Sequence, residues 1–109
     1  MRRLLTDFEL MAMLAVLRRG TEAYGVAVAE ELRSTAGRSV VLAAVYAALG
    51  RLEEKGLIAS RMGEPTAERG GRAKKYFRLT ADGLCAVQDT RRALEAMWTD
   101  LPALEPGVP

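Results

Sequence analysis

Apolar residues recur every three or four positions through the first half of the chain, which is the spacing of amphipathic helices. The segment Thr6-Asp7-Phe8-Glu9 has the pattern of a capping box and begins a helix that Gly20 ends. A second helix is predicted from about Ala23 to Thr35. A third is predicted from Leu42 to Lys55, where Gly56 stops it. The N-terminal half is therefore expected to contain three short helices.

The third predicted helix has one strongly apolar side. Val45, Leu49 and Leu52 recur at steps of four and three, which indicates a buried face. The run from Ser39 to Gly50 carries no charge, but a membrane-spanning helix needs about 20 apolar residues. The run is too short for that, so we expect a soluble protein without a membrane partner.

The spacing of apolar residues changes from three or four positions to two after this helix. The segments LIASRMG and AKKYFRL alternate apolar and polar residues, which predicts two short strands. The segment EPTAERGGR between them contains a proline and a Gly-Gly pair, and we expect it to be the long loop of a hairpin. Thr80 then caps a last helix, predicted from Ala81 to about Leu101, and Pro102 stops it. Residues 102–109 are predicted to be a flexible tail.

Three helices, a hairpin and a final helix in this order predict a mainly α fold with a small β-hairpin. The expected architecture is a winged helix-turn-helix over residues 1–80, followed by a long C-terminal dimerisation helix over residues 81–101. The last helix carries an apolar seam that runs past the part a small domain can cover, which favours pairing with a second copy. Packing against its own domain is the alternative. The expected interface residues are Val87, Leu94, Met97, Trp98 and Leu101.

Charge is distributed unevenly along the chain of 109 residues, whose net charge is +2. Between Arg38 and Arg78 there are nine basic and four acidic residues, which gives +5. The remaining seven basic and ten acidic residues give −3. The middle of the chain is therefore where an anionic partner is expected to bind.

Few residues offer catalytic chemistry. The chain has no histidine, and Cys85 is its only cysteine, so neither an intramolecular disulfide nor a thiolate metal cluster can form. A reducing, cytoplasmic location is expected. The pairs Glu30-Glu31 and Glu53-Glu54 are interpreted as solvated helix surface, because adjacent residues diverge around a helix. We therefore expect no enzymatic activity, no cofactor and no metal.

The segment RGGRAKKYFR places five basic residues within ten positions. Such a loop can follow a phosphate backbone or enter a minor groove. The alternative is a solvated hairpin whose basic side chains prevent edge-to-edge pairing. Its position directly after a helix-turn-helix favours DNA. Within the strand, Tyr76 and Arg78 are expected to point one way, and Phe77 and Leu79 the other.

Four motifs, in this order, resemble the PadR family of transcriptional regulators. They are Tyr24-Gly25-Val26 in the second helix, YAALGRLEEKGL in the third, GRAKKYFRLT in the wing, and Thr80 with Gly83 in the last helix. The resemblance covers roughly residues 4–101. It implies a homodimer on a palindromic operator, usually as a repressor, with the third helix in the major groove and the wing beside the minor groove. It also implies that Tyr46 helps to hold the DNA backbone.

Three features depart from the family pattern. Val41 stands at the cap position of the third helix, where relatives usually carry Ser, Thr or Asn. The missing side-chain cap lowers the stability of the helix by about 1 kcal/mol, unless the helix starts earlier and Ser39 caps it. Gly50 replaces a frequent Lys and costs about 1 kcal/mol of helix propensity. The side chains nearest the bases offer no hydrogen-bond donor and can touch only thymine methyl groups. They are Leu42, Ala43, Ala44 and Ala47.

The sequence thus predicts a sequence-specific DNA-binding transcriptional regulator, a repressor that acts as a homodimer on double-stranded DNA. A winged-helix module that binds protein without DNA is one alternative. A ligand-gated, multidrug-sensing repressor with a site at the dimer interface is another, and its small-molecule effector is unknown. Trp98 would be the ligand platform, but its place one turn beyond the family's tryptophan favours a packing role. The expected DNA-binding residues are Leu42, Ala43, Ala44, Tyr46, Ala47, Arg51, Lys55, Arg69, Gly70, Gly71, Arg72, Lys74 and Lys75.

Overall fold

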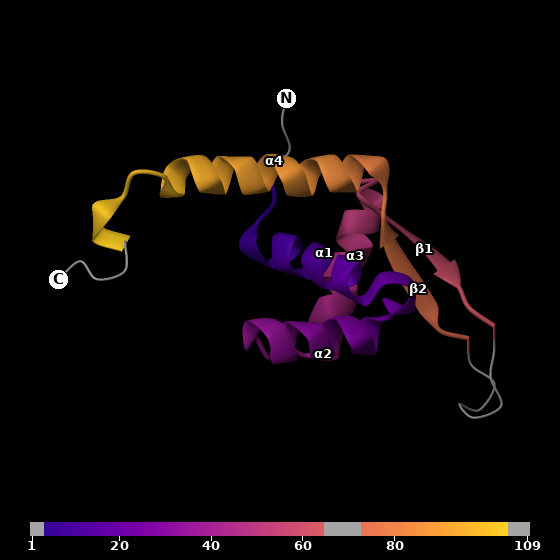
Figure 1. Ribbon diagram of the computed structural model, residues 1–109. Coiled ribbons are helices and arrows are strands. Elements are labelled where there is room, and N and C mark those ends of the chain that lie inside the picture. Colours follow the sequence, from indigo (N-terminus) through magenta and orange to yellow (C-terminus); the bar gives the residue numbers. More distant parts are fainter. Residues whose placement is uncertain (1–3, 65–72, 105–109) are drawn as a thin grey trace.

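A computed structural model describes residues 4–64 and 73–104, and its elements follow the predicted order. Figure 1 shows three helices packed together, a hairpin on one side of them, and a long helix across the top. The fold is mainly helical with a small antiparallel hairpin, as the sequence predicts. The elements are α1 (Asp7–Arg19), η1 (Gly20–Glu22), α2 (Gly25–Ala36), α3 (Leu42–Glu54), β1 (Ile58–Met62), β2 (Lys75–Leu79), α4 (Ala81–Trp98) and η3 (Pro102–Leu104).

The helix ends follow from local side-chain chemistry. Thr6 and Glu9 form the predicted capping box at the start of α1, where the hydroxyl of Thr6 accepts from the backbone N–H of Glu9. Gly37 ends α2 with φ 65°, a left-handed conformation that suits glycine. The helix α3 starts at Leu42 after Val41, with no side-chain cap. Ser39 therefore does not act as a substitute cap.

The hairpin has the predicted alternation of faces. Ile58 pairs with Leu79, and Met62 pairs with Lys75. Phe77 is buried against the helices, and Arg78 is exposed on the other side. The hairpin is also fixed to the start of α2, because the backbone N–H of Phe77 donates to the carbonyl of Ala23 at 2.8 Å.

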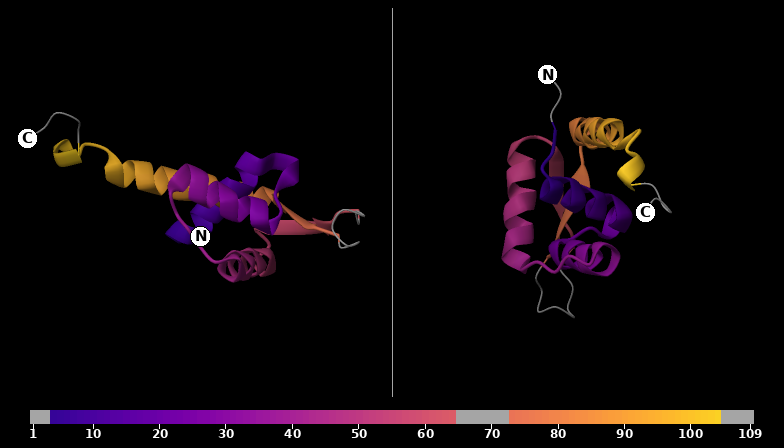
Figure 2. Two further views of the ribbon diagram at one scale, coloured as in Figure 1. Left: turned by 90° about the horizontal axis from the view of Figure 1, so that it is seen from below. Right: turned by 90° about the vertical axis from the view of Figure 1, so that its left-hand side faces the viewer.

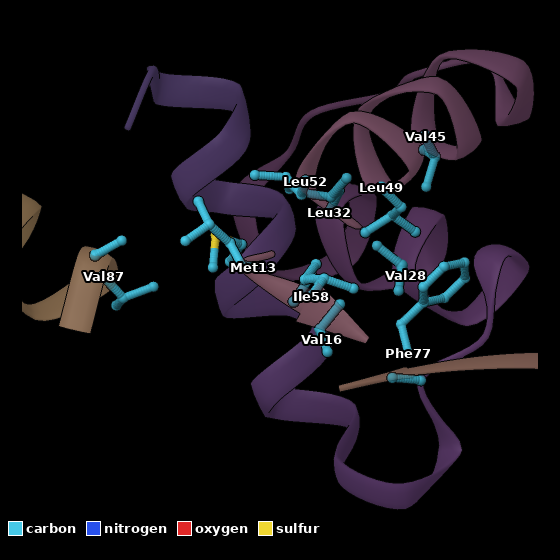
Figure 3. Close-up of a cluster of buried hydrophobic side chains, with 14 residues drawn as sticks. Met13, Val16, Val28, Leu32, Val45, Leu49, Leu52, Ile58, Phe77 and Val87 are labelled. Atoms are coloured by element: carbon cyan, nitrogen blue, oxygen red, sulfur yellow. The ribbon is translucent and has the colours of Figure 1, made fainter. Parts of the chain in front are cut away.

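The hydrophobic core lies where α1, α2, α3 and the hairpin meet (Figure 3). Val45, Leu49 and Leu52 of α3 are fully buried there, as predicted. The first half of α4 closes the core from above. Val87, which the seven-residue repeat placed in the dimer interface, is buried in its own protomer instead. The helix α4 passes over α1 at this point. Its first turns therefore pack against the core, and only its later turns are exposed.

A glycine sets the close contact between α4 and the rest of the domain. A Cβ atom at Gly83 would lie 2.0 Å from the carbonyl oxygen of Leu57. Thr80 caps α4 by accepting from the Gly83 N–H, and its own hydroxyl donates to the Gly56 carbonyl at 2.7 Å. The start of α4 is therefore held against the turn that joins α3 to β1.

The end of α4 differs from the prediction. The helix ends at Trp98, three residues before Leu101, and Asp100 has φ 57°. Thr99 donates its N–H and its hydroxyl to the carbonyl of Glu95, but its own ψ of 142° is extended, so the chain leaves the helix here. Pro102 disfavours helical backbone at Leu101. Residues 102–104, predicted as part of a flexible tail, form a single 3₁₀ turn, while residues 105–109 lie outside the described part.

The paired glutamates were predicted to be solvated, and for Glu31 this is wrong. Its carboxylate accepts from the Nε atoms of Arg18 and Arg19, both at 2.9 Å, and from the hydroxyl of Thr35. The side chain is only 14% exposed. The hydrogen bond from Thr35, followed by that from Arg18, lowers the pKa of Glu31 to about 2. Glu31 therefore joins the end of α1 to α2.

Within residues 4–64 and 73–104, no helix combines the length and the apolar character needed to cross a bilayer. The same residues contain no group of three or more acidic or cysteine side chains placed to hold a metal ion.

We expect Gly83→Ala to lower the free energy of unfolding by about 3 kcal/mol, because the new methyl group collides with backbone that cannot rotate away. Gly50→Ala is the matched control. A Cβ atom there has no neighbour within 4 Å, so alanine should stabilise α3 by about 0.5–1 kcal/mol. Urea unfolding followed by circular dichroism measures both changes. Equal stability of the two variants would contradict the close contact.

Candidate nucleic-acid interface

The outward face of α3 consists mainly of very small side chains. In Figure 2 this helix forms an outer edge of the molecule, as expected for a helix with one free side. Val45, Leu49 and Leu52 hold the opposite face in the core. The residues on the free face are Ala43, Tyr46, Ala47, Gly50 and Arg51.

An apolar patch surrounds the start of α3. Val41 is 72% exposed, and Leu42 is 40% exposed. Val26, from the first turn of α2, is 42% exposed and lines the same shallow groove as Leu42. The sequence identified Leu42 and Ala43 as surface residues but did not identify Val26 as their neighbour. Only the packing of α2 against α3 brings these side chains together.

Tyr46 lies across the first turn of α2. A Cβ atom at Gly25 would come within 2.3 Å of the ring carbon Cζ of Tyr46. Glycine at this position therefore leaves room for the ring, which is a physical reason for the Tyr24-Gly25 motif. The Tyr46 side chain remains 43% exposed. Its ring spans the two helices of the helix-turn-helix, where a contact with a DNA backbone is expected.

Aromatic rings join the wing to α2. The ring of Tyr76 in β2 meets that of Tyr24 edge to face, with centroids 5.7 Å apart. The Arg61 guanidinium lies 4.6 Å from the centre of the Tyr76 ring, and the Lys74 ammonium lies 3.8 Å from the centre of the Tyr24 ring. Lys74, predicted as a phosphate contact, therefore also helps to fix the wing. Sequence reasoning missed the pairing of the two tyrosines, since they are far apart in the chain.

Glu53 connects α3 to both strands of the wing. Its carboxylate accepts from the Ser60 hydroxyl at 2.5 Å and lies 3.4 Å from the Lys75 Nζ. The hydrogen bond from Ser60, together with the charge of Lys75, lowers the pKa of Glu53 below its usual range. Glu53 lies at the surface as predicted, with its side chain 34% exposed, but the sequence did not predict that it joins α3 to the hairpin. Lys75, predicted to contact DNA, points toward α3 and holds the wing in place.

The remaining basic residues divide into two groups. Lys55 forms an ion pair with Glu9 of α1 at 2.7 Å, so it lies beside the first turn of α1 and away from the apolar patch. Arg33, Arg51 and Arg78 are exposed and make no ion pair with any residue that the structure describes. Arg33 lines the groove beside Val26 and Leu42, whereas Arg78 lines a separate hollow with Leu17 and Leu84. All three are available to an anion. Four predicted wing residues lie outside the described residues: Arg69, Gly70, Gly71 and Arg72.

We expect Gly25→Ala to displace the Tyr46 ring. In the native background the substitution should destabilise the fold by about 1 kcal/mol, because the methyl group and the ring compete for one space. In a Tyr46→Ala background it should instead stabilise by up to about 1 kcal/mol, the usual gain of alanine over glycine in a helix. A double-mutant cycle of unfolding free energies measures this coupling. Additive effects would show that the ring does not occupy this space.

Comparison with known proteins gives a consistent result. The family model described as "Transcriptional regulator PadR-like family" matches residues 13–89. A search of curated sequences found no significant match. A PadR-like transcription factor from Bacteroides fragilis superposes with a TM-score of 0.73 at 23% identity, over 90% of this chain and 89% of that one.

Two further solved structures are similar. A PadR-like regulator from Bacillus cereus has a TM-score of 0.72 at 19% identity, over 93% of each chain. A complex of hsRosR-S4 has a TM-score of 0.66 at 26% identity, over 89% of this chain and 76% of that one. These likenesses establish the winged-helix fold, and the family model covers more than half of the sequence. The chain therefore belongs to the PadR-like family of transcriptional regulators.

Proposed function

We propose that the protein is a homodimeric repressor that binds a palindromic operator in double-stranded DNA. The observation that carries the proposal is the arrangement of α3 and the wing. The hairpin runs away from α4 toward the side where α2 and the start of α3 lie, so helix and wing can meet one duplex (Figures 1 and 2). Arg51 on α3 and Arg33 on α2 are exposed basic residues of this surface, and Arg33 lines the groove beside Val26 and Leu42. Family membership supports the regulatory function.

In this arrangement α3 enters the major groove and the wing follows the adjacent backbone. Arg51 and Arg33 contact phosphates directly. Lys74 and Lys75 contribute positive charge from the loop end of the hairpin, where Tyr24 and Glu53 hold them. Phosphate contacts of this kind determine affinity and position rather than sequence.

The second half of α4 is the proposed dimer interface. Met97 is 77% exposed and Trp98 is 67% exposed, and Leu94 is exposed beside them. An apolar groove between α1 and α4 contains Leu14, Leu17 and Trp98. Such large exposed apolar side chains indicate a surface that another protein covers. A second copy fits best, because two antiparallel α4 helices would each place Leu94 and Trp98 against the partner's groove.

We expect Arg51→Ala and Arg33→Ala each to weaken binding to every duplex and to lower the slope of log K against log salt by about one. The reason is that each removes one phosphate contact. Fluorescence anisotropy over a salt series, with a labelled duplex, measures both quantities. The matched control is Arg92→Ala, which removes an exposed arginine of α4 that pairs with Asp89. A slope that falls equally in the control would contradict the assigned surface.

We expect the double substitution Leu94→Glu and Met97→Glu to yield a folded monomer, because four carboxylates would face one another across the interface. Sedimentation velocity measures the assembly state, and circular dichroism checks the fold. The control places the same two charges elsewhere, at Leu4 and Met62, which are similarly exposed and lie outside α4. A double variant that still sediments as a dimer would overturn the assignment of this interface.

A further inference from the structure

The surface that faces DNA in this proposal has almost no hydrogen-bonding capacity at its centre. From Val41 to Gly50 the only polar side chain is that of Tyr46. The end of its ring lies against Gly25, so its hydroxyl is directed to the start of α2. The exposed side chains that remain form a methyl face, defined as Val26, Val41, Leu42, Ala43 and Ala47.

We propose that the methyl face recognises the C5-methyl groups of pyrimidines in the major groove, which in ordinary DNA are those of thymine. This inference rests on the DNA-binding function proposed above. Of the groups that the bases present in the major groove, the thymine methyl is the apolar one, and aliphatic side chains bind it by contact. Side chains without donors or acceptors cannot make the hydrogen bonds that distinguish guanine or adenine.

DNA is a better occupant of this face than an apolar protein surface because of the charges beside it. Arg51 follows Ala47 by one turn on the same side of α3, and Arg33 of α2 lines the same groove as Val26 and Leu42. Glu30 lines this groove too, but its carboxylate pairs with Arg19. Neither Arg51 nor Arg33 has an ion-pair partner among the described residues. A partner that combines exposed methyl groups with flanking negative charge satisfies both features. The small side chains Ala43, Ala47 and Gly50 also let the helix backbone approach the base edges closely.

The methyl group of thymine and its hydrogen-bonding groups can be tested separately with modified bases. Deoxyuridine has the same hydrogen-bonding groups as thymidine and lacks only the methyl group. 5-Methylcytosine has different hydrogen-bonding groups but carries its methyl group at the same place in the groove. A protein that recognises methyl groups should therefore reject deoxyuridine and partly accept 5-methylcytosine. Burial of one methyl group corresponds to about a fourfold change in affinity.

The experiment uses the full chain. Selection from random duplexes first defines the preferred site, and anisotropy then compares that site with thymidine or deoxyuridine at each preferred thymine. We expect about fourfold weaker binding for each contacted methyl group that is removed. A site with cytosine at such a position should bind weakly and regain affinity when that cytosine is 5-methylated. Binding to random duplexes should not respond to deoxyuridine.

Variants connect the effect to the methyl face. Leu42→Ala should reduce the ratio of thymidine to deoxyuridine affinity, whereas Leu4→Ala, which shortens an exposed leucine near Lys55, should not. Equal affinity for thymidine and deoxyuridine sites, or selection without any sequence preference, would overturn the proposal while leaving DNA binding intact. The absence of binding to any duplex at low salt would overturn the proposed function itself.

Discussion

The arrangement of the whole interface depends on the burial of one side of α3. Val45, Leu49 and Leu52 are fully buried among side chains of α1, α2 and the hairpin. Each such residue contributes about 1.5–3 kcal/mol. Their sum exceeds the combined cost of about 2 kcal/mol from an uncapped start at Val41 and a glycine at position 50. The helix therefore keeps a fixed rotation, and this rotation determines which side chains meet a partner.

The wing is positioned by a second set of contacts, made by hydrogen bonds, aromatic rings and charges. The backbone bond from Phe77 to Ala23, the ring pair of Tyr24 and Tyr76, and the carboxylate of Glu53 each fasten the hairpin to a helix. Glu53 carries the connection to α3, and Tyr24 the connection to α2. The two helices and the wing thus form one connected surface. The charges of Lys74 and Lys75 have a structural role as well as an electrostatic one.

The sequence predicted the order of elements, the capping box of α1 and the buried positions of α3, because these follow from local pattern and period. It did not predict that Glu31 and Glu53 each join two elements, because their partners Arg18 and Ser60 come from other parts of the chain. The heptad spacing placed Val87 in the dimer interface, but α4 crosses α1 at that point and buries it. Contacts between distant segments therefore account for most of the differences.

In the proposed function, weak base recognition by each protomer would leave the selection of DNA sites to the dimer as a whole. A face of methyl groups would distinguish bases by modest factors, while the exposed arginines would bind any phosphate backbone. Two protomers joined rigidly would multiply their modest preferences, but only at half-sites whose separation matches the distance between the two α3 helices. The packing of α4 would set that distance. In such a protein, the length between half-sites carries as much information as the bases within them.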